Sequence, residues 1–405
     1  MNRKKVLWIS LCAPYDTVAH AGGKIHNMYL KNMHNSGYFD ISLLSFCYEY
    51  EVPYLDLDKY QIKNQIKVIS DHPVKKFIKK IYNIESVCNP FQKYAGIVPN
   101  YQKHYALKMA RKYSEKNEQP DIVILHWTQM AVLYPRVVKW FPTSTFVMIE
   151  EDVSFLSYRR KADLSQNYFK KQFLKYRYKK LKNIELDVLS VADLTIVNNH
   201  KDEKLLLNNG LPLKKIFVSV PFFTDYSNVQ WKPVTQNILF FGSMMRAENY
   251  KSVIWFIEKV FYKISDPNIK LIIVGGNPHP SLKKYQNSRI RMTGFVEDVS
   301  PFFADSMCFI APLVMGAGIK IKVLEAFSAG IPVLTNEIGI EGIPAVRERD
   351  YLHCETPDDY LAAISSLSKG MIDAESLSVN SKKVIKDHFN FSERINHMIQ
   401  RIYEC

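Results

Sequence analysis

The chain is poor in the features that mark several classes of protein. It has only 15 Gly and 19 Pro among 405 residues, which excludes a collagen-like or low-complexity chain. It contains no run of about 18 apolar residues, so it offers no membrane-spanning helix. Its six Cys are scattered and none forms a Cys-x-x-Cys pair. We therefore expect reduced thiols in a cytoplasmic protein, not a disulfide framework.

Positive charge is what the chain has in excess. Its 54 Lys and Arg against 40 Asp and Glu give a net charge of +14, which suggests an anionic partner. Residues 1–228 hold 34 basic and 21 acidic side chains, a net of +13, whereas residues 229–405 hold 20 and 19. The N-terminal half is thus expected to face an anionic membrane surface or an acidic acceptor, with nucleic acid as the alternative.

Two Lys-rich segments stand out in the N-terminal half. In residues 72–83 an apolar helical face is flanked by Lys75, Lys76, Lys79 and Lys80, a pattern that suits an anionic membrane surface. Residues 168–185 carry a Lys stripe at helical spacing, interleaved with Tyr and Phe, which is also compatible with nucleic-acid binding. A solvated helix face would explain either segment.

Short apolar runs alternate with helical patterns along the whole chain. Because the runs are continuous and not alternating, they predict parallel strands buried on both faces, and so doubly wound α/β domains. The predicted strands are residues 6–12, 41–46, 66–70, 121–126, 145–150, 193–198 and 215–220, then 237–242, 269–276, 307–313 and 331–336. The first follows a basic start and resembles a secretory signal, but Asp16 soon after it favours a strand.

The spacing of these elements predicts the domain organisation. We expect an N-terminal Rossmann-like domain over residues 1–220, a linker over 221–236, and a second Rossmann-like domain over 237–388. Residues 389–405 form a last helix. Open α/β sheets bind ligands beyond the carboxyl ends of their strands, so functional residues should follow strands and precede helices.

The segment 311–336, APLVMGAGIKIKVLEAFSAGIPVLTN, fits this rule best. Gly316 and Gly318 allow the backbone to approach a ligand, and a helix beginning near Ile319 would offer its first N–H groups to an anion. Lys320 and Lys322 add positive charge there. Residues 237–257 repeat the strand–turn–helix order. Gly242 and Ser243 lie at the turn, Asn249 is the expected N-cap, and Arg246 and Lys251 are suited to clamp a diphosphate.

These two segments resemble the signature GxGxKxKxLEAxAxGxPVV of family 4 retaining glycosyltransferases (glycosyl transferases group 1) and their Arg–Lys pair five residues apart. The resemblance implies a GT-B fold, an α/β architecture in which two Rossmann-like doubly wound domains face a cleft. The C-terminal domain would bind a nucleoside diphosphate sugar, and the N-terminal domain would bind the acceptor. The last helix would cross back onto the first domain.

The resemblance also implies roles for individual residues. Glu325 would bind the ribose, and Arg246, Lys251 and the Gly318 loop would stabilise the diphosphate. Many members carry a second Glu eight positions before Glu325, where this chain has Ala317, so backbone amides and Lys320 would replace it. The nucleobase would lie against the turn at Gly294, Phe295 and Val296, with Gly275 nearby. Gly22 and Gly23, before the first helix, would meet the diphosphate and acceptor.

Glu151 stands where relatives often carry the His of a His-Asp-Val motif near the donor sugar. Its carboxylate would orient the sugar or accept the acceptor's proton, or it would simply cap a helix with Asp152. His126 also follows a predicted strand and has a structural alternative. Asp56 and Asp58 match a metal-binding Asp-x-Asp but follow no long strand, so no metal or other cofactor is expected.

The expected activity is metal-independent hexosyl transfer, with retention, onto a cell-surface glycan or lipid-linked glycan at the inner face of the membrane. A nucleotide-sugar epimerase of the same fold and a basic nucleic-acid-binding protein are the alternatives.

Overall fold

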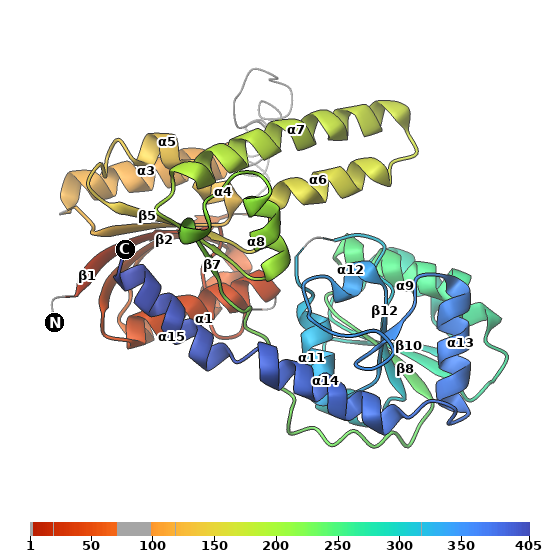
Figure 1. Ribbon diagram of the computed structural model, residues 1–405. Helices are drawn as coiled ribbons and strands as arrows, with labels where there is room; N and C mark the ends of the chain where they lie inside the picture. Colours follow the sequence, from red (N-terminus) through yellow and green to blue (C-terminus); the bar gives the residue numbers. More distant parts are fainter. Residues whose placement is uncertain (1–2, 19, 71–98, 118, 317) are drawn as a thin grey trace. The chain divides into compact units, whose positions relative to one another are not determined.

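The computed structural model describes residues 3–18, 20–70, 99–117, 119–316 and 318–405. The chain forms two compact units (Figure 1). Unit 1 comprises Met1–Val220 together with Phe391–Cys405, and unit 2 comprises Pro221–Asn390. The predicted membrane-surface residues Lys75, Lys76, Lys79 and Lys80 lie outside the described residues, as does Ala317.

Within the described residues, unit 1 is built on a parallel seven-stranded sheet in the order β3-β2-β1-β4-β5-β6-β7. Its strands are β1 (Lys4–Ile9), β2 (Phe39–Tyr48), β3 (Lys63–Ile69), β4 (Ile122–His126), β5 (Thr145–Glu150), β6 (Leu194–Val197) and β7 (Ile216–Val218). The first predicted strand is confirmed as β1, which pairs with both β2 and β4. The strands β4 and β6 are buried along their whole length, as continuous apolar runs require.

The helices of unit 1 follow these strands. They are α1 (Ala21–Asn35), α3 (Asn100–Lys116), α4 (Thr128–Ala131), α5 (Tyr134–Val137), α6 (Ser154–Asp163), α7 (Tyr168–Val191), α8 (His200–Leu207) and α15 (Phe391–Tyr403). Short 3-10 turns are η1 (Glu49–Tyr54), η2 (Leu57–Tyr60) and η3 (Leu213–Lys215). The last helix, α15, buries Ile395, Met398, Ile399 and Ile402, and the Tyr29 and Phe391 rings stack at 6.4 Å.

Unit 2 repeats the plan with the order β10-β9-β8-β11-β12-β13 in the part of the chain that is described. Its strands are β8 (Asn237–Phe241), β9 (Lys270–Val274), β10 (Ile290–Gly294), β11 (Cys308–Ala311), β12 (Val333–Thr335) and β13 (Leu352–His353). Its helices are α9 (Ala247–Lys259), α10 (Ser300–Asp305), α11 (Ile321–Ala329), α12 (Glu337–Ile340), α13 (Pro357–Ser368) and α14 (Ala374–His388), with 3-10 turns η4 (Phe261–Lys263) and η5 (Pro280–Tyr285).

Both sheets have the doubly wound Rossmann order, so the prediction of two such α/β domains is confirmed. In each unit the strand order reverses at the first strand, between β1 and β4 and between β8 and β11. Strands β10 and β13 were not expected. The first is five residues of mixed polarity and the second has only two residues, so neither gives an apolar run.

The segment 221–236, predicted to be a linker, lies along unit 2 as extended chain. The Trp231 indole N–H donates to the Ser306 carbonyl at 2.9 Å, and the Tyr226 N–H donates to Ser328 Oγ at 3.0 Å. The segment is therefore held by unit 2 and is not a free tether.

The loops after β8 and β9 are packed backbone to backbone. A Cβ atom added to Gly275 would overlap the carbonyl oxygen of Gly242, and both residues have positive φ. Gly294, at the end of β10, also has positive φ, but nothing lies within 4 Å of the position of its Cβ. We expect Gly275→Ala to lower the free energy of unfolding of unit 2 by more than the roughly 1 kcal/mol that positive φ alone costs.

Gly294→Ala is the matched control, since it adds only the conformational cost. Thermal and urea unfolding of the two variants test this packing, and equal losses of stability would contradict it.

Candidate functional site

The candidate site of unit 2 lies where its strand order reverses. Strand β8 is followed by the loop 242–246, and strand β11 is followed by the loop that precedes α11. This carboxyl edge, at the point where the strand order reverses, is the place at which open α/β sheets bind their ligands. Helices α9 and α11 both begin here, and neither has a side-chain cap on its first N–H groups.

Lys322 lies in the first turn of α11 and reaches the loop after β8. Its Nζ donates to Asn249 Oδ1, lies 4.7 Å from the centre of the Phe240 ring, and would be 2.9 Å from a Cβ on Gly242. Among the described residues no carboxylate forms an ion pair with it. Burial lowers the pKa of Lys322 to about 7, with Arg246 and Lys320 acting in the same direction. A desolvated ammonium without a counter-ion, between two uncapped helix ends, is suited to bind an anion.

The residues of the loop after β8 differ from expectation in one respect. The N-cap of α9 is Arg246, so the prediction that Asn249 caps this helix is wrong. Asn249 is instead buried in the first turn, where its amide donates to the Ser243 carbonyl at 2.8 Å and accepts from Lys322. Ser243 and Lys251 are exposed, and the exposed Arg246 pairs with Glu248. Asn249 therefore positions Lys322, while Arg246 and Lys251 lie at the surface.

The loop before α11 contains the two predicted glycines. Gly316 and Gly318 have φ of +140° and +70°, and the helix begins at Ile321, two residues later than Ile319. Lys320 is the N-cap residue. Its ammonium donates to the Gly318 carbonyl and lies 3.6 Å from Glu341. Lys320 thus closes the loop on itself, so its charge is partly balanced whereas that of Lys322 is not.

Glu325 is only 3% exposed, in the second turn of α11. Its Oε1 accepts from the Thr224 N–H at 3.4 Å, a long bond. Burial raises the pKa of Tyr226 to about 12, and the nearby charge of Glu325 acts in the same direction. Glu325 is therefore held on the inner side of the helix.

Beside this loop, β9 and β10 end in small residues and one large exposed ring. Phe295 is 77% exposed and packs against Gly276, at which a Cβ would be 3.4 Å from that of Phe295. Val296 is half-buried. Gly275 packs against the carbonyl oxygen of Gly242. An aromatic face this open, at the carboxyl edge of the sheet, can stack on a planar ligand.

Unit 1 has a buried polar cluster at its own reversal point. His126, at the end of β4, places Nε2 2.8 Å from Glu151 Oε1, and Asn198 donates to Glu151 Oε2 at 2.9 Å. Tyr29 in turn has its hydroxyl 2.9 Å from Asn198 Oδ1. Burial raises the pKa of Glu151 to about 8 and lowers the pKa of His126 to about 3. One proton is therefore held between two neutral groups near pH 7.

The helix-capping alternative for Glu151 is not what the geometry shows. The N–H groups of Ser154 and Phe155, at the start of α6, donate to Glu185 of α7 at 2.7 and 3.0 Å. Glu151 is instead bound to His126 and Asn198. His126 Nδ1 and His26 Nε2 are buried and have no hydrogen-bond partner among the described residues, which leaves acceptor or donor capacity inside the cluster.

The predicted glycines of unit 1 have packing explanations. Gly22 and Gly23 lie within the first turn of α1 and do not precede it as expected. A Cβ on Gly22 would meet the Trp127 ring at 3.5 Å, and one on Gly23 would collide with Val18 and His20. The glycines bring α1 close to β4 and its following residues.

Asp56 and Asp58 have structural partners. Asp56 forms an ion pair with Lys31 at 3.0 Å and accepts from the Asp16 N–H, and Asp58 accepts from Asn64. No cluster of three or more His, Cys, Asp or Glu side chains suited to a metal occurs in the ranges that the structure describes. In the same ranges, no helix is both long and apolar enough to cross a membrane.

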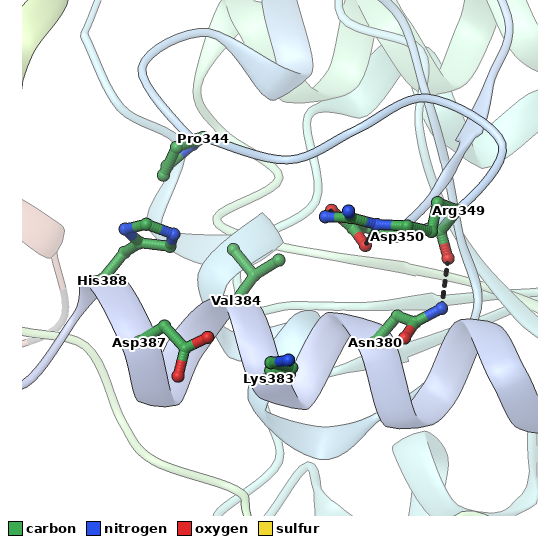
Figure 2. Close-up of a pocket in the computed structure, with 8 residues that line it drawn as sticks. All are labelled: Pro344, Arg349, Asp350, Asn380, Lys383, Val384, Asp387 and His388. Atoms are coloured by element: carbon green, nitrogen blue, oxygen red, sulfur yellow. Dashed lines mark hydrogen bonds and ion pairs between the residues drawn. The ribbon is translucent and has the colours of Figure 1, made fainter.

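A separate polar pocket of about 300 Å³ lies between α14 and the loop before β13 (Figure 2). Its Arg349 and Asp350 are paired at 2.7 Å, and Asn380 donates to the Arg349 carbonyl. The charges on its wall are therefore largely balanced, and it contains none of the predicted site residues. The remaining lining residues are Pro344, Lys383, Val384, Asp387 and His388.

Sequence reasoning missed three features of these sites. Lys322 counted only as added charge, because its burial and its lack of a counter-ion depend on Phe240 and Asn249 far away in the chain. Asn198 and Tyr29 gave no signal, since each becomes polar support for Glu151 only through the order of β1, β4, β5 and β6. The place of Asn198 as the last residue of the predicted strand 193–198 is the one clue that was available.

The buried carboxyl predicts a pH dependence of stability. Because the pKa of Glu151 is raised by folding, the native state keeps a proton that the unfolded chain loses above about pH 4.5. Wild-type stability should therefore fall between pH 4.5 and about 8 relative to Glu151→Gln, which cannot titrate. The expected difference is on the order of a few kcal/mol at pH 8, measured by urea unfolding of both proteins. Parallel pH profiles would contradict it, and Glu203→Gln, at a carboxyl outside the cluster, is the control.

The match to a known protein family lies within unit 2. Residues 235–369 match the family model described as Glycosyl transferases group 1. An "Uncharacterized 44.6 kDa protein in cps region" of Klebsiella pneumoniae is 25% identical over 234 residues, which are 55% of this chain and 59% of that protein. The match thus spans about three fifths of the relative.

Solved structures resemble the whole chain. The Anabaena protein Alr3699/HepE, in complex with UDP-glucose, has a TM-score of 0.66 at 12% identity and covers 99% of this chain and 100% of its own. Sucrose-phosphate synthase from Thermosynechococcus elongatus has a TM-score of 0.67 at 13% identity, with 98% of each chain covered. At these identities the likeness concerns the fold. The expected resemblance to glycosyl transferases group 1 is confirmed: the chain has the GT-B fold, and its residues 235–369 match the model of that family.

Proposed function

We propose that the protein is a retaining glycosyltransferase that moves a hexosyl group from a nucleoside diphosphate sugar to an acceptor hydroxyl. The observation that carries this proposal is the desolvated Lys322, which lies between the uncapped starts of α9 and α11 and has no ion-pair partner among the residues that the structure describes. It lies inside the segment that matches the family model. A diphosphate supplies the charge that this site is missing.

In this proposal the leaving group is stabilised by fixed positive charge. The bond between the anomeric carbon and the diphosphate oxygen breaks, and the acceptor oxygen forms its bond to that carbon on the same face. The acceptor proton passes to the departing diphosphate. Negative charge grows on the diphosphate as its bond breaks, so Lys322, Arg246, Lys251 and Lys320 bind the transition state more strongly than the donor. No metal is required for that role.

The rest of the donor has partners along the same edge. Glu325 would accept hydrogen bonds from the ribose after turning from the weakly bound Thr224 N–H, and Phe295 would stack on the base. Alr3699/HepE is described in complex with UDP-glucose, so UDP is the first donor nucleotide to test. In unit 1, Glu151 and its partner His126 are proposed to orient the sugar.

The acceptor is proposed to be a surface glycan or a lipid-linked glycan made at the inner face of the membrane. Two observations support this: the relative from the Klebsiella cps region and the +13 net charge of residues 1–228. The first predicted contact with an anionic membrane is the segment around Lys75, Lys76, Lys79 and Lys80. If the donor is instead converted to its epimer without any acceptor, the protein is an epimerase and not a transferase.

Arg246 and Glu325 give the direct test of the donor site. Arg246→Ala should weaken UDP binding by about tenfold or more, because it removes a charged hydrogen-bond donor from the diphosphate. Glu325→Gln should weaken UDP more than the free diphosphate, since it touches the ribose alone. Isothermal titration of UDP, GDP, ADP and the free diphosphate against each variant measures both effects.

The matched control is Lys259→Ala, an exposed cation at the opposite end of α9. Unchanged UDP affinity in Arg246→Ala and Glu325→Gln, with the wild type binding UDP, would overturn the assignment of the site.

Lys322 predicts a proton uptake on donor binding. A bound diphosphate holds the ammonium protonated, whereas in the free protein burial, opposed only weakly by Glu248 and Glu325, keeps its pKa near 7. Between pH 6 and pH 8 the UDP affinity of the wild type should therefore fall by about tenfold more than that of Lys322→Met. The variant supplies the control, because its profile contains the titration of UDP itself. Identical slopes in the two proteins would contradict the role given to Lys322.

A further inference from the structure

The hairpin formed by α6 and α7 is anchored at one end only. The buried residues of α7 lie between Leu181 and Leu189, and those residues belong to the core of unit 1. None of residues 168–180 is buried. Figure 1 shows α6 running along α7, with the end of the hairpin clear of the sheet of its own unit. In the hairpin end, residues 156–182, Leu156, Tyr158, Tyr178 and Leu181 pack on that core. The part between Tyr158 and Tyr178 is held mainly by the contact between α6 and α7.

The hairpin end exposes large apolar side chains that a solvated helix would not need. Phe169 is 82% exposed and Tyr168 is 68% exposed, and both lie in the first turn of α7. Phe173 and Tyr176 continue along the same helix at intervals of four and three residues, so the three rings share one face. Leu164, at the end of α6, is also exposed. Five exposed apolar side chains in one place mark a contact surface.

The same residues carry most of the excess charge of the protein. Residues 156–182 contain ten Lys and Arg against the single acidic residue Asp163, a net of +9 within a chain of +14. Some cations lie against the rings: the Arg177 guanidinium is 5.7 Å from the centre of Phe173, and Lys180 Nζ is 5.9 Å from that of Tyr176. Aromatic and cationic groups are therefore mixed on one surface.

We propose that the hairpin end binds the surface of an anionic lipid bilayer. Phe and Tyr side chains at a projecting tip can enter the boundary between headgroups and acyl chains, while Lys and Arg extend to the phosphates. Each Lys near an anionic surface adds about 1 kcal/mol of attraction. A nucleic acid would be bound better by a groove that follows its backbone than by the end of a helical hairpin with an aliphatic Leu164.

This inference builds on the proposed function, because it names the surface by which a transferase acting on lipid-linked glycans would reach them. The base of the hairpin supports that link within unit 1. Glu151 precedes α6 by three residues, and Glu185 of α7 binds the first N–H groups of α6. The surface that contacts the bilayer and the Glu151 cluster are thus joined by one rigid element.

Charge reversal on the hairpin is the first test. Binding of the full chain to vesicles of phosphatidylglycerol and phosphatidylcholine is measured by co-sedimentation, with pure phosphatidylcholine as the uncharged reference. The triple variant Lys170→Glu, Lys171→Glu and Lys175→Glu should bind the anionic vesicles at least tenfold more weakly. The matched control reverses three exposed lysines of α3 in the same unit, Lys108, Lys112 and Lys116. Equal losses in both triples, or no loss in either, would overturn the proposal.

Removal of the rings is the second test. Tyr168→Ser with Phe169→Ser keeps every charge, yet should lower vesicle binding at least fivefold and make what remains more sensitive to salt. Phe169→Trp in the presence of Tyr168 should bind like the wild type. Met371→Ser, an equally exposed apolar residue of unit 2, is the control and should change nothing. Full binding by the Ser variant would refute insertion of the rings.

Two further measurements separate this inference from its alternatives. If the Lys170, Lys171 and Lys175 triple loses binding to a single-stranded oligonucleotide but keeps binding to vesicles, the surface serves nucleic acid and the proposal is wrong. UDP titration of each variant reports on the donor site independently. A wild type that binds anionic vesicles through the hairpin but binds no nucleotide would contradict the proposed function and would still support the membrane-binding surface.

Discussion

Burial of both faces of each parallel sheet decides where polar chemistry can lie in this protein. Strands such as β4 and β8 are apolar along their middle residues because helices cover them on both sides. Most of the groups that could contact a ligand therefore lie at or just beyond the strand ends. The strand order then reverses once in each unit, which opens the carboxyl edge at β1 and β4 and at β8 and β11. Both candidate sites are consequences of that one constraint.

The two sites use burial in opposite ways. In unit 1 a carboxyl and an imidazole are buried together, so a single proton satisfies both and neither needs to be charged. In unit 2 a lysine is buried against a ring and a neutral amide, so its charge is stabilised poorly until an anion arrives. The first arrangement needs no counter-ion. The second is incomplete without a ligand and suits binding.

The charge of the chain has a third location that neither site explains. Most of the excess lies on the hairpin end, residues 156–182, among exposed aromatic rings. Electrostatic attraction to a surface falls off within about a Debye length, so such a patch acts only on a partner that it touches. A hairpin rooted beside Glu151 couples that contact mechanically to unit 1.

The sequence by itself determined the α/β class, most strands, and the glycine and lysine motif before Glu325. These features are local, since an apolar run or a Gly-x-Gly turn acts through its own neighbours. It did not reveal β13, whose two residues become a strand only by pairing with β12. The sequence predicted Asn249 to be a helix N-cap, because an amide suits both a cap and a hydrogen-bond partner of a lysine. Only the contact with Lys322, which lies far away in the chain, decided between these two roles. Likewise Glu151 became a partner of His126 only because β4 and β5 are neighbours in the sheet. Burial, and with it the charge state of Lys322 and Glu151, is a property of contacts between distant residues, so the tertiary structure alone decided it.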